Sequence, residues 1–254
     1  RCRIRSPNVS SSSGCGRPAS IFRKTGPPPG QYIDVRTENQ SFDIMSISQG
    51  RVGTMMGLSQ AERVETLLTS STLFQMLGAK PLHGRLLRLD EDQPGQPPVV
   101  VLSHAFWTRV FGGDPGIIGK NVTLNVGVPG SGETKNLFEV VGVLQPDFLM
   151  NAEIMPTVAS LTRVDVFMPL PLGADAANAR GDENYNLMAR LRPGVTLAQA
   201  KADVAGTAGR IREKDKRDRS FTIDVVSLND SVIGNVRLAM LVLFGWVTVV
   251  VLIA

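Results

Sequence analysis

The side chains that could carry nucleophilic or acid–base chemistry are few and scattered in this sequence. It holds two histidines, His83 and His104, while both cysteines, Cys2 and Cys15, stand near its start. Ser103 precedes His104, but a nucleophile and its base must meet in space with a third orienting group, which sequence neighbours do not provide. We therefore interpret Ser103 as a helix N-cap and His104 as a residue of the first helical turn.

A glycine-rich segment over residues 113–121, GDPGIIGKN, has some features of a phosphate-binding loop. The step from Gly113 to Gly119 is one residue longer than in G-x-x-x-x-G-K-[ST], and Asn121 replaces the required hydroxyl residue. The flanking patterns also run from helix to strand, the reverse of the order in a phosphate loop. We interpret the segment as a turn that Asp114 and Pro115 begin.

Two acidic clusters, DED at residues 90–92 and DEN at residues 182–184, raise the question of a metal site. Neither has the D-x-[DN]-x-[DN]-G spacing of a calcium loop, and two cysteines alone make no metal site. We interpret both clusters as solvated turns and expect no catalytic, cofactor-binding or metal-binding residue and no cofactor. Three neighbouring aromatic residues are predicted to pack in the core: Phe106, Trp107 and Phe111.

The charge distribution separates residues 1–30 from the rest of the chain. These residues hold six basic side chains and no acid, so of 27 basic residues 21 remain against 23 acidic ones, a balance of −2. A nucleic-acid-binding face needs concentrated positive charge, so we expect no nucleic-acid partner. Residues 1–30 are rich in Ser, Gly and Pro and are predicted to be a disordered tail, to which a Cys2–Cys15 disulfide would be confined.

The final residues, 238–254, read LAMLVLFGWVTVVVLIA and carry no charge. About 20 apolar residues span the hydrocarbon core as a helix, so this run predicts a truncated transmembrane helix over residues 230–254. A buried core helix is the alternative, but the run lacks the polar stripe of an amphipathic helix. We therefore expect a membrane protein in which residues 31–229 form an extramembrane domain.

Short strands and helices alternate through this domain. Thr196 and Gln199 form a capping box, and the helix that follows carries an apolar stripe at Leu197, Ala200, Val204, Ala208 and Ile211. Gly78 can end another helix over residues 71–77, and a third follows Ser103. His83 is predicted to lie in a turn. Strands are predicted over residues 42–47, 62–69, 85–89, 99–102, 121–126, 138–144, 164–168, 185–191 and 221–228.

Eight stretches together resemble the extracytoplasmic core domain of MacB-like, FtsX-like ABC transporter permeases, most closely the large duplicated permeases of soil acidobacteria. The most specific is VVVLSHAFWTRVFGGDPGIIGKNVTLN at residues 99–125. The others are VRTENQSF (35–42), ERVETLLTSSTLFQMLGAKPLHGRLL (62–87), DEDQPG (90–95), FEVVGVLQPDF (138–148), DVFMPLPLG (165–173), YNLMARLRPGVTLAQAKADV (185–204) and VIGNVRLAMLVLFGWVTVVVLIA (232–254).

The resemblance implies an α+β domain, with a porter-like part of βαβ units and an inserted second part, on the periplasmic side of a bacterial inner membrane. It also implies a cytoplasmic ABC ATPase as a separate chain, a second permease copy or half, and a substrate that is a lipid, lipoprotein, peptide or drug. Because the side chains for catalysis are missing, we expect no enzyme activity; the resemblance implies that such a domain passes on motion driven by ATP hydrolysis.

The chain departs from the family in two places. The family has a transmembrane helix before the stretch at residues 35–42, where this sequence is polar, and residues 127–136 resemble an insertion. A binding or sensor domain tethered by a single helix, with no ATPase partner, is the alternative. If the chain is a permease, the helix that starts near Ser231 is predicted to join the last strand to the bilayer and to transmit motion as a lever. Gly234 is the residue at which this helix is predicted to be weakest.

Overall fold

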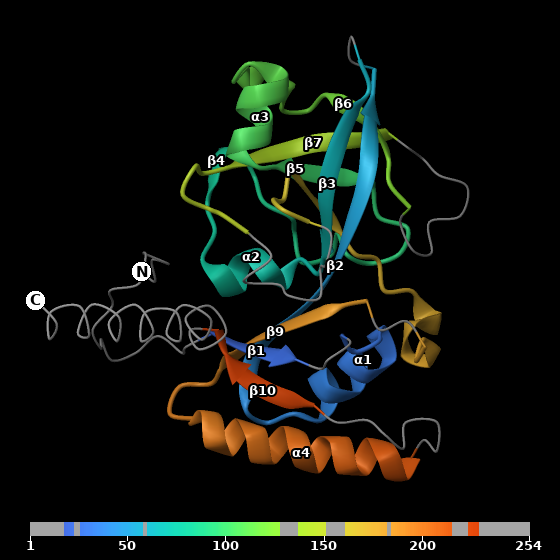
Figure 1. The fold of residues 1–254 in the computed structure, drawn as a ribbon, viewed down its shortest axis with the longest axis vertical. Coiled ribbons are helices and arrows are strands. Elements are labelled where there is room, and N and C mark those ends of the chain that lie inside the picture. Colours follow the sequence, from blue (N-terminus) through green and yellow to red (C-terminus); the bar gives the residue numbers. More distant parts are fainter. Residues whose placement is uncertain are drawn as a thin grey trace, which may run out of the picture.

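The computed structural model describes residues 18–22, 26–57, 60–127, 137–150, 161–181, 184–214 and 223–228. The chain segments at its two ends build one part of the fold, at the bottom of Figure 1. Its elements are β1 (Pro18–Phe22), α1 (Pro29–Glu38), β2 (Phe42–Met56), β9 (Asn186–Leu191), α4 (Leu197–Lys214) and β10 (Asp224–Ser227).

This first part is a split βαβ arrangement. Its strands follow the order β10-β1-β9-β2, and every neighbouring pair is antiparallel. Each β–α–β unit therefore encloses one strand of the other unit between its own two strands. Helices α1 and α4 contact each other, and α4 also contacts β10.

The residues between β2 and β9 form a second, inserted part, most of which lies at the top of Figure 1, while its last short helix contacts α1 of the first part. Its elements are β3 (Glu62–Thr69), α2 (Thr72–Leu77), β4 (Pro81–Gly84), β5 (Val99–Leu102), α3 (His104–Phe111), η1 (Pro115–Ile117), β6 (Asn121–Asn125), β7 (Leu137–Leu144), β8 (Val166–Pro169) and η2 (Ala174–Asn178).

The long strand β2 joins the two parts into one mixed sheet. Its residues up to Ser48 pair with β9, and those from Ser48 to Met55 pair with β3. Beyond β3 the sheet continues through β8, β5 and β7 to β4, while β6 pairs with both β2 and β7. The α+β architecture, with βαβ units and an inserted second part, is thus confirmed.

Two apolar clusters fill the core. The larger one contains the buried stripe of α4, from Ala200 to Ile211, and Phe106 of α3. The smaller one gathers around α2, whose Phe74 and Leu77 are both buried in it. Gly78 ends α2 in the left-handed conformation that the sequence predicted for it.

The predicted capping box opens α4. The Thr196 hydroxyl accepts from the Gln199 backbone N–H at 3.2 Å, and the Gln199 side chain accepts from the Thr196 N–H at 2.8 Å. The two residues thereby satisfy each other's unpaired backbone donors.

Removing this cap should destabilise the domain modestly. We expect Thr196→Ala to lower the free energy of unfolding by about 1 kcal/mol, because one N–H of the first turn loses its acceptor. Thr196→Ser keeps the hydroxyl and should cost much less. Urea unfolding followed by circular dichroism measures both, and equal losses would contradict the capping role.

The prediction of a disordered tail is wrong for residues 18–22 and 26–30. The strand β1 lies between β9 and β10, and residues 26–30 are buried at the start of α1. A Cβ at Gly26 would overlap the carbonyl group of Tyr185. Composition misled here because β1 is only five residues long and pairs with strands more than 160 residues away in the sequence.

The prediction of a strand over residues 85–89 is also wrong. The strand in this region, β4, ends at Gly84 and contains His83, for which a turn was predicted. Residues 81–84 pair with β7, whereas Arg85 and Arg88 turn toward the carboxylate of Glu91.

Other sequence predictions fall outside the described residues. These concern Cys2 and Cys15, most of the 127–136 segment, Asp182 and Glu183, and residues 229–254 with Ser231 and Gly234. Within the described ranges, none of the helices combines the length and the apolar character that crossing a membrane requires. The boundaries at residues 31, 229 and 230 stay predictions.

Candidate functional site

The residues that could have formed a catalytic pair have structural roles. The Ser103 hydroxyl accepts from the Phe106 backbone N–H at 3.3 Å, as an N-cap does. The rings of His83 and His104 both lie against Trp107, with centroids 5.2 Å and 5.5 Å from it. Phe106 and Trp107 are buried, which confirms the prediction that these aromatic residues pack in the core.

The glycine-rich segment after α3 is the predicted turn. The carboxylate of Asp114 accepts from the Gly116 backbone N–H at 2.8 Å, and its carbonyl oxygen accepts from the Trp107 indole at 2.9 Å. The segment runs from α3 into β6, so its order is the reverse of that in a phosphate loop.

The acidic cluster at residues 90–92 is not a fully solvated turn. The side chain of Glu91 is only 2% exposed and binds Arg85 through two hydrogen bonds, of 2.7 Å and 3.0 Å. It also accepts from the Arg88 backbone N–H at 2.8 Å. The sequence prediction failed for Glu91 because its partners lie three and six residues earlier, within a run that was predicted to be a strand. Among the described residues no acidic, histidine or cysteine group of three or more could hold a metal ion.

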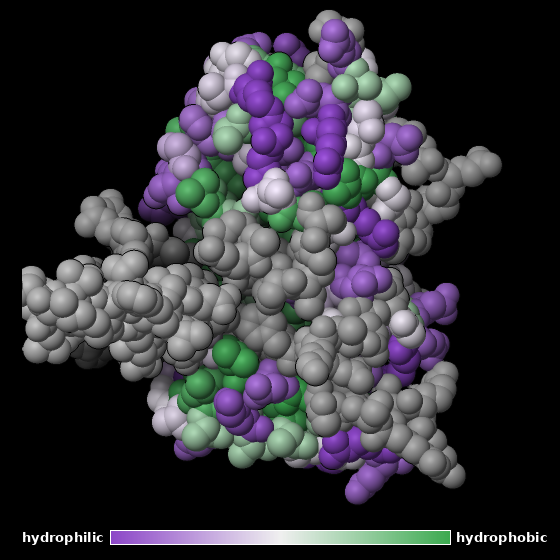
Figure 2. All heavy atoms as spheres, in the orientation of Figure 1, coloured by the Kyte–Doolittle hydropathy of each residue, from purple (hydrophilic) through white to green (hydrophobic). Residues whose placement is uncertain are grey.

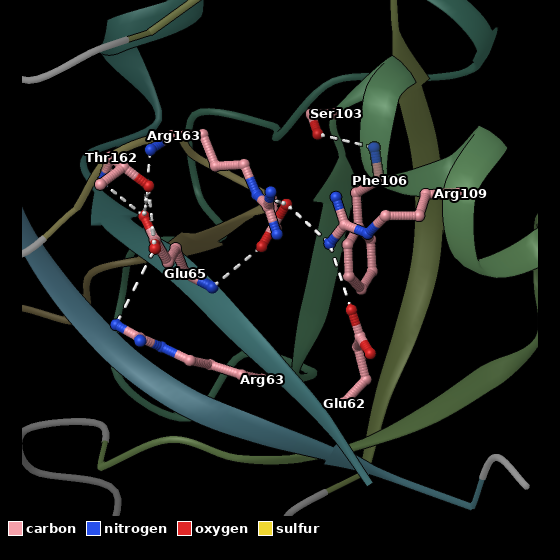
Figure 3. Close-up of polar contacts among 9 residues, drawn as sticks. Glu62, Arg63, Glu65, Ser103, Phe106, Arg109, Thr162 and Arg163 are labelled. Carbon is pink, nitrogen blue, oxygen red and sulfur yellow. Dashed lines mark hydrogen bonds and ion pairs between the residues drawn. The ribbon is translucent and has the colours of Figure 1, made fainter. Parts of the chain in front are cut away.

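A pair of further buried carboxylates, Glu65 and Asp165, was missed altogether. Glu65 lies on β3, and Asp165 comes just before β8, which runs parallel to β3. The Asp165 backbone N–H donates to the Glu65 carbonyl at 2.8 Å, and the Glu65 N–H donates to the Asp165 carboxylate at 3.1 Å. With Glu62, Arg63, Arg109, Thr162 and Arg163 they form what we call the carboxylate–arginine cluster (Figure 3).

Asp165 holds two arginines on the surface of this cluster. Its side chain is 1% exposed and accepts from Arg163 Nε at 3.0 Å and from Arg109 Nη2 at 3.3 Å. The Arg109 guanidinium also lies 5.2 Å from the ring centroid of Phe106 and 3.4 Å from the Glu62 carboxylate. Asp165 thereby connects α3 to the segment before β8.

Glu65 binds the same segment through its backbone. One carboxylate oxygen accepts from the N–H groups of Thr162, at 2.6 Å, and Arg163, at 3.0 Å, and the Thr162 hydroxyl donates to the other oxygen at 3.2 Å. Burial by itself raises the pKa of Glu65. The hydrogen bonds from Arg163 and Thr162, with the charge of Arg63, outweigh burial and hold this pKa below its ordinary value of 4.5.

The chemistry of this cluster favours a structural joint over catalysis. A general acid needs a raised pKa, and the pKa of Glu65 moves in the opposite direction. The acceptors of Asp165 are likewise occupied by N–H groups and guanidinium groups. One sequence signal could have revealed the pair: each acid lies within a run that was predicted to be a strand, next to apolar residues, and a charge at such a position is buried only when it is paired.

The lowered pKa of Glu65 predicts a specific pH dependence. In the unfolded chain its pKa is near the ordinary value, so the stabilisation is complete above about pH 4.5 and is lost as the pH falls through the lower folded pKa. Glu65→Gln should therefore cost stability at neutral pH, and this cost should shrink on acidification. Urea unfolding of both proteins between about pH 7 and pH 3.5 tests this; a pH-independent difference would contradict it.

Among the residues that Figure 2 colours, hydrophilic side chains interrupt the hydrophobic areas. Single large hydrophobic residues are nevertheless exposed among the described residues. The most exposed are Leu149, at 73%, and Leu89, at 64%.

A sequence model of the MacB-like periplasmic core domain family matches residues 8–207. None of the curated proteins compared with the chain matches it. The fold is similar to that of the periplasmic region of MacB from Actinobacillus actinomycetemcomitans, with 16% identity, a TM-score of 0.57, and coverage of 88% of this chain and 94% of that one.

Two further solved structures share the fold. A domain of a protein named as a permease from Porphyromonas gingivalis has 16% identity and a TM-score of 0.55, with coverage of 83% and 87% of the two chains. The extracellular domain of the noncanonic ABC-type transporter YknZ from Gram-positive bacteria has 13% identity and a TM-score of 0.51, with coverage of 78% and 94%. These likenesses and the family match agree with the α+β prediction.

Proposed function

This chain belongs to the family of MacB-like periplasmic core domains, the extracytoplasmic domains of ABC transporter permeases, and from this premise we propose that it couples cytoplasmic ATP hydrolysis to motion outside the cell's inner membrane. The family match over residues 8–207 is the observation that carries the proposal. The ATPase would be a separate cytoplasmic chain, and the permease would work with a second copy or half. Its substrate would be a lipid, lipoprotein, peptide or drug.

The way the chain enters and leaves the sheet supports this role. Ala19 near the start of β1 pairs with Ser227 at the end of β10, so the segments before β1 and after β10 depart from the same edge region. A domain held between two neighbouring membrane helices needs this arrangement. The proposed second helix is the apolar run at residues 238–254.

We propose a mechanical and not an enzymatic role for the domain. The buried carboxylates Glu65, Glu91 and Asp165 use their oxygens to bind backbone N–H groups and arginines. Such fully bonded groups tie strands, helices and turns together. A domain that passes on motion benefits from parts that move as rigid bodies.

The test uses the intact permease with its ATPase in lipid vesicles, because coupling cannot be measured on a domain alone. Cys2 and Cys15 are replaced by serine, and a spin label is placed at exposed Ala202 on α4. We expect trapping of the nucleotide-bound ATPase to change the distance between the labels of the two copies. Gly234→Pro should abolish this change while ATP turnover persists, since proline interrupts a helix.

The matched control is Gly234→Ala, which favours the helix and should keep the nucleotide-dependent change. An unchanged distance in the unsubstituted permease, or failure of any ABC ATPase to co-purify with it, would count against the proposal. The second result would favour the alternative of a tethered binding or sensor domain.

A further inference from the structure

The start of α2 rests on buried hydroxyl groups. The Thr69 hydroxyl lies 2.8 Å from that of Ser48 and 3.4 Å from that of Ser46, both on β2. The Ser70 hydroxyl lies 2.9 Å from those of Ser46 and Thr72, where α2 begins. Because a hydroxyl both donates and accepts and can rotate, these groups can exchange partners without leaving one unpaired.

The apolar cluster around α2 is also adaptable. It contains Met76 of α2 together with Met150 and Met188, and methionine fills irregular space because its unbranched side chain is flexible. The Phe74 ring packs in this cluster against Phe167, with centroids 5.4 Å apart and the ring planes tilted. Both supports of α2 therefore tolerate a small displacement of the helix.

This cluster reaches the point where the chain leaves the sheet. Leu228, the residue after β10, packs against it half-buried, and Met188 of β9 belongs to it. Helix α2 contacts β9, which only β1 separates from β10 in the sheet. A displacement of the chain after β10 would therefore act on the packing of α2 through Leu228.

The residue just before α2, Ser71, also contacts a turn at the surface. The carboxylate of Asp92 accepts from both the backbone N–H and the hydroxyl of Ser71, each at 3.0 Å. The Ser71 hydroxyl also approaches the Leu89 carbonyl, at 3.4 Å. Buried Glu91 stiffens this turn, whose Leu89 is 64% exposed. Movement of the start of α2 would therefore move the exposed turn at residues 88–90.

We propose that α2 is a movable element that transmits the position of the chain leaving β10 to the exposed turn at residues 88–90, with Leu228 as its positioning residue. In this proposal α2 has two positions, which differ in which of the buried hydroxyl groups are paired. Such a pair of positions is the two-state element that coupling between distant sites requires. The inference rests on the proposed function, in which the segment after β10 moves with the membrane helices.

Hydrogen exchange measured by mass spectrometry on the full chain tests whether Leu228 supports the packing of α2. We expect Leu228→Ala to speed amide exchange about tenfold in residues 71–77 and 86–92, by local opening, while α4 keeps its protection. The matched control is Leu172→Ala, a half-buried leucine that packs against the other cluster, and it should leave α2 unchanged. Leu228→Met should restore wild-type exchange in α2.

Unchanged exchange in residues 71–77 of Leu228→Ala would overturn the inference, as would equal acceleration in every element. In the intact permease, a spin label at exposed Gln75 of α2, paired with one at Ala202, should report a nucleotide-dependent distance that Leu228→Ala abolishes. If that distance changes equally in both proteins, the α2 proposal fails while the coupling function stands. If the exchange results hold but no distance depends on nucleotide, the coupling function fails and the support of α2 by Leu228 stands.

Discussion

Replacing Ser20 by proline is expected to lower the free energy of unfolding by about 1–3 kcal/mol for the ladder hydrogen bond it removes, and to prevent folding altogether if β1 leaves the sheet. Ser20 pairs with Met188 of β9 on one side and with Val226 of β10 on the other. Proline has no backbone N–H and is tolerated in sheets only at edges, strand starts or bulges. Loss of β1 would also leave β10 without its partner strand.

The control at the same position is Ser20→Ala, which keeps the backbone N–H. We expect it to unfold at nearly the same urea concentration as the unsubstituted chain. Circular dichroism and urea unfolding compare the three proteins. If proline and alanine behaved alike, β1 would not contribute to the sheet, and the disordered tail that composition predicts would be the better description.

Replacing Asp165 by alanine is the second substitution with a large expected effect, a loss of about 2–3 kcal/mol of unfolding free energy. Breaking a buried ion pair typically costs about 3–5 kcal/mol. The cost is smaller here because Arg109 and Arg163 are 36% and 53% exposed and can be hydrated after the change. The Glu65 backbone N–H would lose its acceptor as well.

The control for Asp165 shares its partner Arg109. Glu62 also binds Arg109, at 3.4 Å, but its side chain is 38% exposed. We expect Glu62→Gln to cost at most about 0.5 kcal/mol, as exposed ion pairs usually do. Equal losses for the two substitutions in urea unfolding would show that burial of Asp165 is not what makes its contacts important.

Local patterns predicted the elements whose cause is local. The apolar run Val99–Leu102 is a fully buried strand, as its composition indicates. Ser103 caps α3, and Thr196 with Gln199 caps α4, because a cap is formed by residues within one turn. The turn that Asp114 begins and the packing of the α3 aromatic residues in the core were predictable for the same reason.

The cluster of Glu65 and Asp165 shows what local patterns cannot supply. The two residues are 100 positions apart, and only the parallel pairing of β3 with β8 brings them together. Glu91 was misjudged although its partners are close in sequence, because Arg85 and Arg88 were assigned to a strand and not to the turn that surrounds its carboxylate. Whether a charge is solvated or buried is decided by what packs over it.

By itself the sequence determined the periodic helices and strands, their caps and the family to which the domain belongs, since each depends on neighbouring residues or on many short motifs in order. The tertiary structure alone decided that Pro18–Phe22 is an inner strand, that β2 serves two parts, and that three carboxylates are buried. The physical reason is that strand pairing and burial are non-local: a five-residue segment or a single acid is stabilised by partners whose distance along the chain gives no signal in the segment itself.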